Sequence, residues 1–455
     1  MSEWKKVKIG DVCKIVKGTT GIASAVPGEF PLVVTAVERK TCSTYQFDCE
    51  AVCIPLVSSS GHGKKSLNNV HYQSGKFALG TILCAVIPNN PDELDARYLH
   101  QYLQFYKDTV LVPLMKGAAN VSLSMKDIAG VSIPLPPIQR QRELAEMFVT
   151  LQEKQKELFT EFEKQTEYAK QLRQNILQEA IEGKLTADWR KQHPVQKGNP
   201  DYDAETLFEQ IQTEKYHTDL FAPNGAHAKK AKSVSSEPIR VTRKEKSLPP
   251  ITEDEIPFEI PTGWKWVRLG EICSKIGSGS TPLGSDYCEN GIPFFRSQNV
   301  YNEGLEFKDI VFISSSMQEK MKGTIVRPND LLLNITGGSL GRCAVVPENI
   351  KEGNVSQHVC IIRPLLTNHL HLHLFVLSEL FQKNIKTSGA GRQGLPKYNL
   401  ERMLVPLPPL AEQKEIVARV EKHLQTITQL ETQIATRETT TKQLMQSILK
   451  DAFEE

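Results

Sequence analysis

Apolar residues between positions 139 and 182 recur at alternating spacings of four and three residues, with the polar Gln155 and Gln165 filling two places. This heptad pattern predicts one long helix whose apolar stripe faces a partner helix. At ~1.5 Å per residue such a helix would extend about 65 Å. The apolar members of the stripe are Leu144, Phe148, Leu151, Leu158, Phe162, Ala169, Leu172 and Ile176.

The same pattern returns 272 positions later, at residues 411–455, without a gap. A Pro-Leu-Pro-Pro run precedes both copies, and KQLRQNILQEAIE at 170–182 corresponds to KQLMQSILKDAFE at 442–454. The second stripe contains Ile416, Val420, Ile427, Leu430, Ile434, Leu444 and Ile448. Because an apolar stripe on a lone helix would not stay in water, we expect the two copies to pair with each other.

Each long helix follows a stretch of short apolar runs bounded by Gly, Asn and Pro, which is typical of a mixed α/β unit. In residues 1–138 the runs 31–34 and 82–87 predict buried strands, and residues 98–106 predict a helix. A last strand is expected at 128–133, where the proline run ends it because proline cannot donate to a ladder.

Residues 262–410 form a second unit that opens like the first, since Trp4 matches Trp264 and Cys13 matches Cys273. Its middle differs: residues 292–300 and 326–333 have no clear counterpart. The chain is therefore a tandem repeat with shared frames and divergent middles.

The repeat predicts an α+β protein in which two α/β units are separated by two long coiled-coil helices related by a pseudo-two-fold axis. The helices run antiparallel if that axis crosses them. The polar stripe positions do not decide the orientation. Antiparallel pairing about Leu158 and Phe162 places Gln155 opposite Arg437, whereas parallel pairing places Gln165 there.

Residues 184–261 differ in composition and are expected to form a linker, with one possible short helix at 203–211. The part from 223 to 250 is rich in Lys, Ser, Pro and Gly, and we interpret it as a solvated tether rather than a phosphate-binding arm. Its basic residues are Lys229, Lys230, Lys232, Arg240, Arg243, Lys244 and Lys246.

The composition of the 455 residues is that of an ordinary globular protein, with 40% hydrophobic and 24% charged residues. The net charge of +2 neither demands nor excludes a nucleic-acid partner, because binding depends on local patches. We find no run long enough to span a membrane and no secretion signal. The nine cysteines form no CxxC pair, which favours reduced thiols in a cytosol.

A search for catalytic motifs finds none with the required spacing. There is no methyltransferase tetrapeptide, and Ser60–Ser66 lacks the leading Gly of a phosphate-binding loop and has Lys, not Ser or Thr, after its first Lys. His369, His371 and His373 alternate as on one strand face, but their neighbours favour a helix, on which only two of them share a side. We therefore expect no catalytic residue and no metal site.

The whole layout resembles the specificity (S) subunit of type I restriction-modification enzymes. The residues that carry the resemblance are the two Pro-Leu-Pro-Pro entries with Gln141/Gln413 and Glu143/Glu415, the helix ends 176–180 and 448–452, the segment Gly183-Lys184-Leu185-Thr186 with Trp189-Arg190, and the Gly263–Ile272 opening of the second unit.

The resemblance implies a non-catalytic subunit whose two units, residues 1–138 and 262–410, are target recognition domains that each read one half of an asymmetric, bipartite DNA target. The helices at 139–183 and 411–455 would set the spacing and dock two methyltransferase (M) subunits, which restriction (R) subunits join. S-adenosylmethionine, ATP and Mg would bind to those partners. This chain would bind none of these cofactors. The assembled complex would methylate and cut double-stranded DNA in the cytoplasm, as a bacterial defence, without contact with a membrane.

Loop residues with amide or basic side chains are the candidates for DNA contact, since these groups match base edges and phosphates. In the first unit they are Lys64, Lys65, Asn68, Asn69, Lys116, Asn120 and Lys126. In the second unit they are Arg296, Gln298, Asn299, Arg392, Gln393 and Lys397. Asn120 and Arg392 correspond to each other in the loop before the last strand.

Two other classes of protein remain possible from the residues. A coiled-coil scaffold with two ligand-binding heads fits the near-neutral charge, but it does not explain why the heads share a frame and diverge inside. A stand-alone DNA enzyme would need the catalytic motifs that the chain lacks.

Overall fold

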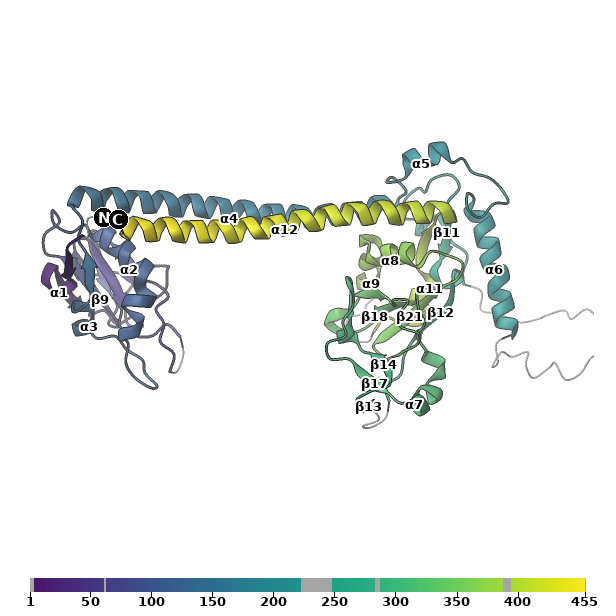
Figure 1. Ribbon diagram of the computed structural model, residues 1–455, viewed down its shortest axis with the longest axis horizontal. Coiled ribbons are helices and arrows are strands. Elements are labelled where there is room, and N and C mark those ends of the chain that lie inside the picture. Colours follow the sequence, from purple (N-terminus) through teal and green to yellow (C-terminus); the bar gives the residue numbers. More distant parts are fainter. Residues whose placement is uncertain (1–3, 61–62, 222–247, 283–286, 388–393, 455) are drawn as a thin grey trace, which may run out of the picture. The chain divides into compact units, whose positions relative to one another are not determined.

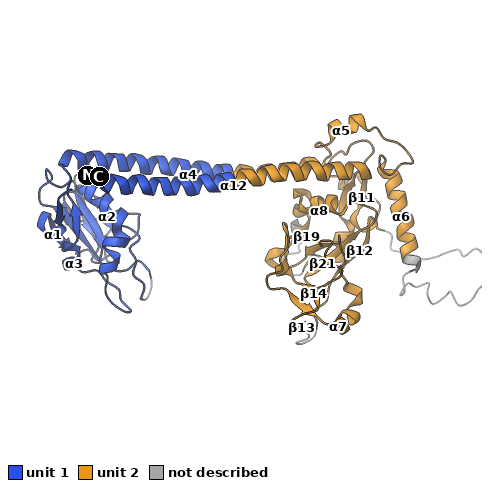
Figure 2. Ribbon diagram, viewed as in Figure 1, with its two compact units in different colours: residues 1–165, 433–455 blue, residues 166–432 orange. Residues whose placement is uncertain are grey.

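The computed structural model describes residues 4–60, 63–221, 248–282, 287–387 and 394–454. The chain divides into two compact units (Figure 2): residues 1–165 with 433–455 form unit 1, and residues 166–432 form unit 2. Two long helices, α4 (Ile138–Ile181) and α12 (Leu410–Glu454), each contribute to both units. Each unit is described below by itself (Figure 1).

Unit 1 is built on two four-stranded sheets, in the orders β2-β9-β6-β7 and β4-β3-β8-β5, with a short antiparallel pair, β1 and β10, beside them. The strands are β1 (Lys6–Lys8), β2 (Cys13–Lys17), β3 (Phe30–Val33), β4 (Lys40–Cys42), β5 (Phe47–Asp48), β6 (Ala51–Pro55), β7 (His71–Gln73), β8 (Lys76–Leu79), β9 (Leu83–Pro88) and β10 (Ser132–Pro134). β6 is buried along its whole length, as its uninterrupted apolar sequence requires.

Three helices complete this unit: α1 (Ile9–Val12), α2 (Ala96–Val110) and α3 (Met125–Ala129). α2 begins after Asp95, whose side chain accepts hydrogen bonds from the backbone N–H groups of Arg97 and Tyr98. The predicted strands at 31–34 and 82–87 and the helix at 98–106 are confirmed. The strand expected at 128–133 is shorter, because Ser124 caps α3 there and leaves only Ser132–Pro134 extended.

Unit 2 repeats this plan, with sheet orders β12-β21-β18-β19 and β13-β17-β14-β20 and the pairs β11-β22 and β15-β16. Its strands are β11 (Lys265–Arg268), β12 (Cys273–Ser278), β13 (Tyr287–Cys288), β14 (Ile292–Phe295), β15 (Val300–Tyr301), β16 (Gly304–Leu305), β17 (Val311–Ile313), β18 (Leu331–Asn334), β19 (Cys343–Val345), β20 (Asn354–Val355), β21 (Val359–Pro364) and β22 (Leu404–Leu407). Its helices, apart from the long ones, are α5 (Ala187–Gln192), α6 (Ala204–Phe221), α7 (Ser315–Lys320), α8 (His369–Leu377), α9 (Glu379–Thr387) and α11 (Lys397–Arg402).

The predicted repeat is confirmed down to single hydrogen bonds. In unit 1 the N–H of Ile9 donates to the carbonyl of Val131 at 2.9 Å, and in unit 2 the N–H of Leu269 donates to the carbonyl of Met403 at 2.8 Å. Val131 and Met403 are 272 positions apart, the same offset that relates the long helices.

The long helices run antiparallel within each unit. In unit 1 the rings of Phe148 and Phe453 lie 4.7 Å apart, and further along α4 the ring of Phe159 has the Lys442 ammonium 5.1 Å from its centre. In unit 2 Arg173 pairs with Glu431 at 3.1 Å. The residue number along α12 falls as the number along α4 rises, which decides the orientation that the sequence left open.

The register of the pair differs from the one centred on Leu158 and Phe162, because Lys442 rather than residue 433 lies at Phe159. Four predicted stripe residues accordingly face solvent: Leu158, Leu172 and Leu430 are each 45% exposed and Leu444 is 58% exposed. A strict seven-residue count drifts against the 3.6-residue turn of a helix, so the contact passes to their neighbours. The other stripe residues lie buried or half-buried: Leu144, Phe148, Leu151, Phe162, Ala169, Ile176, Ile416, Val420, Ile427, Ile434 and Ile448.

The segment expected to be a linker is partly folded. α5 and α6 occupy much of residues 187–221, and Ala204, Leu207 and Ile211 of α6 are buried in the core of unit 2. The basic residues Lys229, Lys230, Lys232, Arg240, Arg243, Lys244 and Lys246 lie outside the described part of the chain.

The chain resumes at Leu248, where the buried guanidinium of Arg268 holds it. Arg268 donates to the carbonyls of Pro249 and Pro250 at 2.9 and 3.1 Å and pairs with Glu255 at 2.7 Å. This pairing lowers the pKa of Glu255 to about 2. The end of the segment therefore belongs to unit 2 as well.

Candidate nucleic-acid interface

Two loops of unit 1 bring most of its candidate residues together, at the end of the unit away from α4 (Figure 1). The N–H of Ser58 donates to the carbonyl of Val121 at 3.0 Å, and a Cβ on Gly63 would lie 3.0 Å from the carbonyl of Ala118. The loop after β6 therefore packs against the loop before α3. Their exposed candidates are Lys64, Lys65, Asn68, Lys116 and Asn120.

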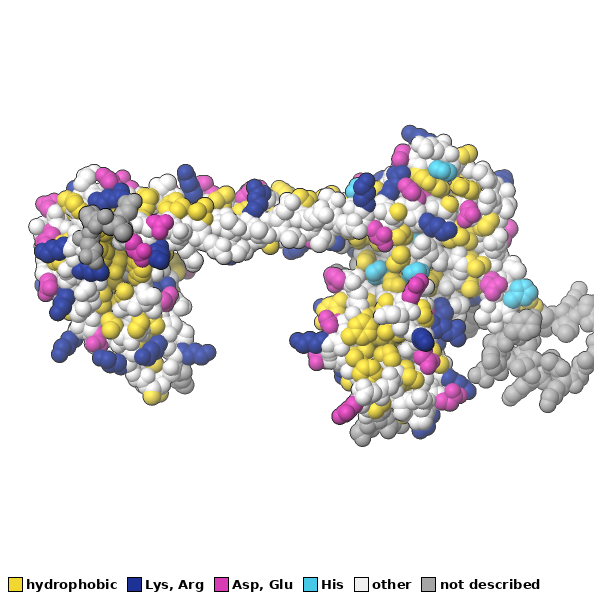
Figure 3. Space-filling model, in the orientation of Figure 1, with side chains coloured by type: hydrophobic (Ala, Val, Ile, Leu, Met, Phe, Trp, Pro, Cys, Tyr) yellow, Lys and Arg dark blue, Asp and Glu magenta, His cyan; other side chains and the backbone are white. Residues whose placement is uncertain are grey.

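The charge around these loops is mostly positive. Lys116 pairs with Asp127 at 3.2 Å, and hydrogen bonds from Ser124 and then Lys116 lower the pKa of that carboxyl group. Lys126 is exposed on α3, and Asn69 is half-buried. Several Lys and Arg side chains lie on the surface of this part of unit 1 (Figure 3). Such a surface fits a phosphate backbone and places amide side chains beside it.

The candidates of unit 2 divide into exposed and structural residues. Gln298 is exposed, and Arg296 is half-buried and donates to the carbonyl of Asp309 at 2.7 Å. Asn299 is only 1% exposed; its amide accepts from the N–H of Arg296 and donates to the carbonyl of Glu306, both at 3.0 Å. The prediction that Asn299 contacts DNA is therefore wrong, because its side chain closes a turn inside the unit.

The remaining candidates of unit 2 lie around the loop before α11. Arg392 and Gln393 fall outside the described residues. Lys397, at the start of α11, is exposed and pairs with Glu401 at 3.3 Å.

This loop is anchored as in unit 1. The N–H of Leu123 donates to the carbonyl of Leu56 at 2.9 Å, and the N–H of Leu395, 272 positions later, donates to the carbonyl of Ile335 at 2.9 Å. In both units the residue two positions before the short helix, Leu123 or Leu395, is therefore bonded to the residue that follows the inner strand β6 or β18.

Three residues of unit 2 that sequence reasoning missed share this place. The hydroxyl of Thr336 lies 2.9 Å from Nδ1 of His358, and the amide of Gln357 lies 3.4 Å from Nε2 of the same ring. A Cβ on Gly394 would lie 3.0 Å from the methyl group of Thr336. The position of Thr336 just after an apolar strand was the only available signal, because the middles of the two units do not align.

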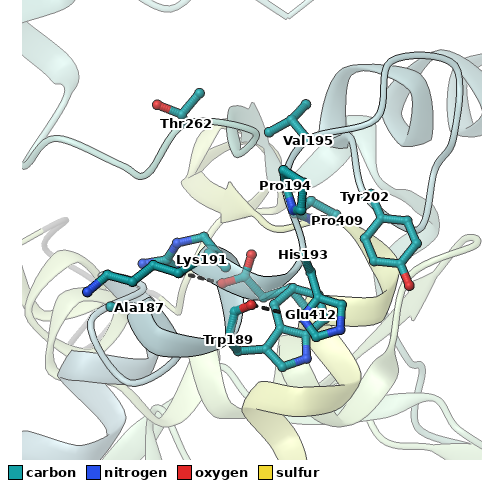
Figure 4. Close-up of a pocket in the computed structure, with 11 residues that line it drawn as sticks. Ala187, Trp189, Lys191, His193, Pro194, Val195, Tyr202, Thr262, Pro409 and Glu412 are labelled. Atoms are coloured by element: carbon teal, nitrogen blue, oxygen red, sulfur yellow. Dashed lines mark hydrogen bonds and ion pairs between the residues drawn. The ribbon is translucent and has the colours of Figure 1, made fainter.

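A separate cavity of about 330 Å³ lies where α5 meets the start of α12 (Figure 4). Glu412, which is 1% exposed, accepts hydrogen bonds from Thr186 at 2.6 Å and Trp264 at 2.7 Å and forms an ion pair with Arg190. The ring of Trp189 stacks on His193 at 4.1 Å. The segment 183–190 thus joins the end of α4 to the start of α12.

The buried histidines show no arrangement for catalysis. Burial lowers the pKa of His371 to about 4, and burial followed by the charge of Arg39 lowers that of His71 to about 4, so both rings are neutral near pH 7. His373 is on the helix α8, and its Nε2 lies 2.8 Å from the carbonyl oxygen of Cys343. Among the described residues no group of three His, Cys, Asp or Glu side chains could hold a metal ion, and no helix there is long and apolar enough to cross a membrane.

The two repeats match a known protein family. The family model described as "Type I restriction modification DNA specificity domain" matches residues 1–176 and 261–437, which is one match for each repeat. The chain belongs to this family.

Individual relatives agree with this assignment. The specificity subunit of the type I restriction enzyme EcoAI of Escherichia coli is 27% identical over 69% of this chain and 49% of its own length. The EcoDI specificity subunit of the same species is 23% identical over 99% of this chain and 88% of its own length. The match thus spans about half the length of EcoAI, and 59% of the EcoBI specificity subunit.

Two solved structures share the fold. A chain from a study of assembly and conformational transition of a type I R-M system has a TM-score of 0.59 at 18% identity, covering 100% of this chain and 98% of its own. The HsdS subunit from Thermoanaerobacter tengcongensis has a TM-score of 0.54 at 18% identity, covering 100% and 97%. They confirm the predicted architecture of two α/β units and paired long helices.

Proposed function

We propose that this chain is the non-catalytic DNA sequence-specificity subunit of a type I restriction-modification complex, and that it recognises an asymmetric bipartite target in duplex DNA. One observation carries the proposal. The bonds Leu123–Leu56 and Leu395–Ile335 join equivalent residues in the two units. The described side chains around these bonds differ between the units.

This combination of an equal frame and unequal side chains is what two different half-sites require. Unit 1 presents Lys64, Lys65 and Asn120, whereas unit 2 presents Gln298, Thr336 and His358. Amide, hydroxyl and imidazole groups can discriminate base edges, and lysines hold the backbone. Each unit would therefore read its own sequence, and the helices would keep the two readers at a fixed separation.

The partners follow from the exposed leucines of the long helices. Leu172 and Leu430 each precede a member of the Arg173–Glu431 ion pair in unit 2. Leu158 and Leu444, which are their counterparts at an offset of 272, are exposed in unit 1. Two equivalent apolar sites fit two M subunits, since exposed apolar side chains at equivalent places mark interaction surfaces.

In the assembled complex the chemistry belongs to the partners. M subunits would bind S-adenosylmethionine and methylate the target, and R subunits would join them and use ATP and Mg to cut DNA. This chain would supply recognition and assembly. The complex would act in the cytoplasm, where DNA is the accessible substrate.

The proposal is tested by expressing this chain with its cognate M subunits and mapping methylated bases across the host genome. A single split motif with two unlike halves is expected. Replacing unit 2 residues Gln298, Thr336 and His358 by alanine should alter one half of the motif and leave the other unchanged. Methylation without a defined split motif, or none at all while the complex assembles, would contradict the proposal.

A further inference from the structure

Unit 2 contains a polar cavity of about 460 Å³ along the edge strand β12, and residues of α6 and α11 also line it. Among the described strands β12 ends its sheet and pairs with β21 alone, so alternate backbone N–H groups point away from the sheet. In the described residues no atom lies within 4 Å of the position that a Cβ on Gly277 would take. A ligand can therefore approach the backbone of this strand closely.

Three lysines line the cavity. The ammonium of Lys215, on α6, donates to the carbonyl of Gly270, and that of Lys275, on β12, donates to the carbonyl of Gly323. Lys397, on α11, pairs with Glu401 at 3.3 Å. The lining thus holds three ammonium groups and one carboxylate.

The surroundings add to this positive charge. Burial lowers the pKa of Lys275, and the nearby charges of Arg363, Arg327 and Lys397 lower it further, against an opposing effect of Asp330. Asp330 is already engaged by Arg363 through two contacts of 2.7 and 2.8 Å. A bound anion would relieve the repulsion among these cations.

The equivalent face of unit 1 is also basic, although its lysines stand at other positions. The two faces correspond because Gly10 packs against Ala129 as Gly270 packs against Glu401, and Glu401 lies 272 positions after Ala129. The edge strand β2 carries the exposed Lys14 and Lys17.

The exposed Lys126 of α3 adds to that face. Both faces are positively charged, but their lysines stand at positions that are not equivalent. A ligand that binds both faces should therefore offer many identical anionic groups. The sugar–phosphate backbone of DNA is such a ligand.

We propose that the cavity formed by Lys215, Lys275 and Lys397 binds a backbone phosphate of duplex DNA and so adds affinity without sequence preference. The inference rests on the proposed DNA-binding function and extends it from the candidate Lys397 to the edge strand β12 and α6. The three ammonium groups and the free N–H groups of β12 are the donors.

The test uses the complex of the full chain with its M subunits and fluorescence anisotropy with two labelled duplexes, one carrying the mapped motif and one scrambled. The affinity is measured over a series of salt concentrations for the wild type, Lys275→Gln, Lys397→Gln and the double variant. Loss of one phosphate contact should lower the slope of log K against log salt by about 0.9 and the affinity near 150 mM salt by about fivefold, equally for both duplexes.

Two further variants separate charge from structure. Lys275→Arg keeps the charge and should keep the wild-type slope. Lys383→Gln is the matched control, because Lys383 pairs with Glu379 at i,i+4 spacing as Lys397 does with Glu401. It should leave affinity and slope unchanged.

The outcomes separate this inference from the proposed function. An unchanged slope in the double variant, while the wild type still prefers its motif, would refute the phosphate site alone. A loss confined to the motif duplex would show that the lysines read bases and would also overturn it. A wild-type complex that binds neither duplex contradicts the proposed function itself.

Free phosphate is the other source of the same chemistry. If inorganic phosphate raises the melting temperature of the wild type but not of Lys275→Gln, and the DNA slopes of the two are equal, the cavity binds a free anion. That result would overturn the assignment to DNA.

Discussion

Gln141 and Gln413, which lie 272 positions apart, make the same hydrogen bonds at the starts of the two long helices. The amide of Gln141 donates to the carbonyl of Pro136 at 2.8 Å and accepts from the N–H of Asp95 at 2.9 Å. Gln413 donates to the carbonyl of Pro408 at 2.8 Å and accepts from the N–H of Asn368 at 2.8 Å. Both side chains are fully buried. Each long helix is thereby fixed to the unit from which it emerges.

Replacing either glutamine by alanine should destabilise its own unit. The change leaves buried backbone groups without partners, which costs about 2–4 kcal/mol for this set of bonds. Chemical denaturation of the full chain measures the effect. Gln171→Ala is the control, because Gln171 is exposed on α4 and its side chain donates to Glu167 at a long distance of 3.5 Å. Equal stabilities of Gln141→Ala and Gln171→Ala would show that the buried bonds contribute nothing.

Gln298 and Asn299 are neighbours with opposite exposures, and they should respond differently to mutation. Gln298→Ala should leave the melting temperature unchanged and weaken binding of the motif duplex by about 1–3 kcal/mol if its amide reads a base. Asn299→Ala removes two internal hydrogen bonds and should lower the stability of unit 2 by about 1–3 kcal/mol. Thermal unfolding and anisotropy on the same preparations check both statements. A stable Asn299→Ala with altered specificity would reverse our assignment.

These glutamine and asparagine residues show which features the sequence could predict. Gln141 and Gln413 lie in the shared frame, where the repeat itself compares each position with its counterpart. Asn299 lies in the divergent middle, so its amide looked like any loop amide until the turn around it was known. Thr336 and His358 were missed for the same reason, since they meet only because β18 and β21 are neighbours.

The long helices show a different limit. The heptad pattern predicts that the two helices exist and pair. It does not predict their register, because the apolar stripe has more positions than the number that pack against the partner helix. Leu158 and Leu172 fit the pattern as well as Phe162 does, yet they face solvent. The folding of α6 onto unit 2 was also hidden, since an amphipathic helix does not reveal which surface covers it.

The exposed leucines lead to a prediction about assembly. Replacing Leu172 and Leu430 together by glutamate should leave the fold intact, because both are 45% exposed, and should prevent one M subunit from binding. Native mass spectrometry should then show one M subunit per chain instead of two. Asn175→Glu, an exposed charge change on the same helix, should keep two. Two M subunits on the double variant would show that docking lies elsewhere.

The buried histidines predict how stability depends on pH. Burial lowers the pKa of His371 from 6.5 to about 4, so between these values the unfolded chain binds more protons than the folded one. The contribution of His371 to the free energy of unfolding should therefore be fully retained above pH 6.5 and fall by up to ~1.4 kcal/mol per pH unit below it, and His71 should add a contribution of the same sign. His371→Gln should flatten this dependence in denaturation measured at pH 7, 6 and 5. The exposed His423→Gln should follow the wild type, and a curve for His371→Gln as steep as the wild type would count against the assignment.

Glu412 provides the sharpest test of the junction between the helices. Its carboxylate is 1% exposed, accepts hydrogen bonds from Thr186 and Trp264 and forms an ion pair with Arg190. Its counterpart at an offset of 272 is Arg140, whose side chain is 39% exposed. Glu412→Ala would leave the Arg190 charge poorly compensated and two donors unpaired, at a cost of about 3–5 kcal/mol. Arg140→Ala should cost less than about 1 kcal/mol, as for a surface ion pair.

Tryptophan fluorescence during denaturation includes a signal from this junction, because Trp264, one of the chain's four tryptophans, donates its indole N–H to Glu412 at 2.7 Å. Glu412→Gln should be more stable than Glu412→Ala, because the amide oxygen of glutamine still accepts one hydrogen bond. It should be less stable than the wild type, because the negative charge that pairs with Arg190 is lost. If Glu412→Ala and Arg140→Ala unfold at the same denaturant concentration, the buried carboxylate does not hold the end of α4 to the start of α12. The segment 183–190 would then be a passive connection.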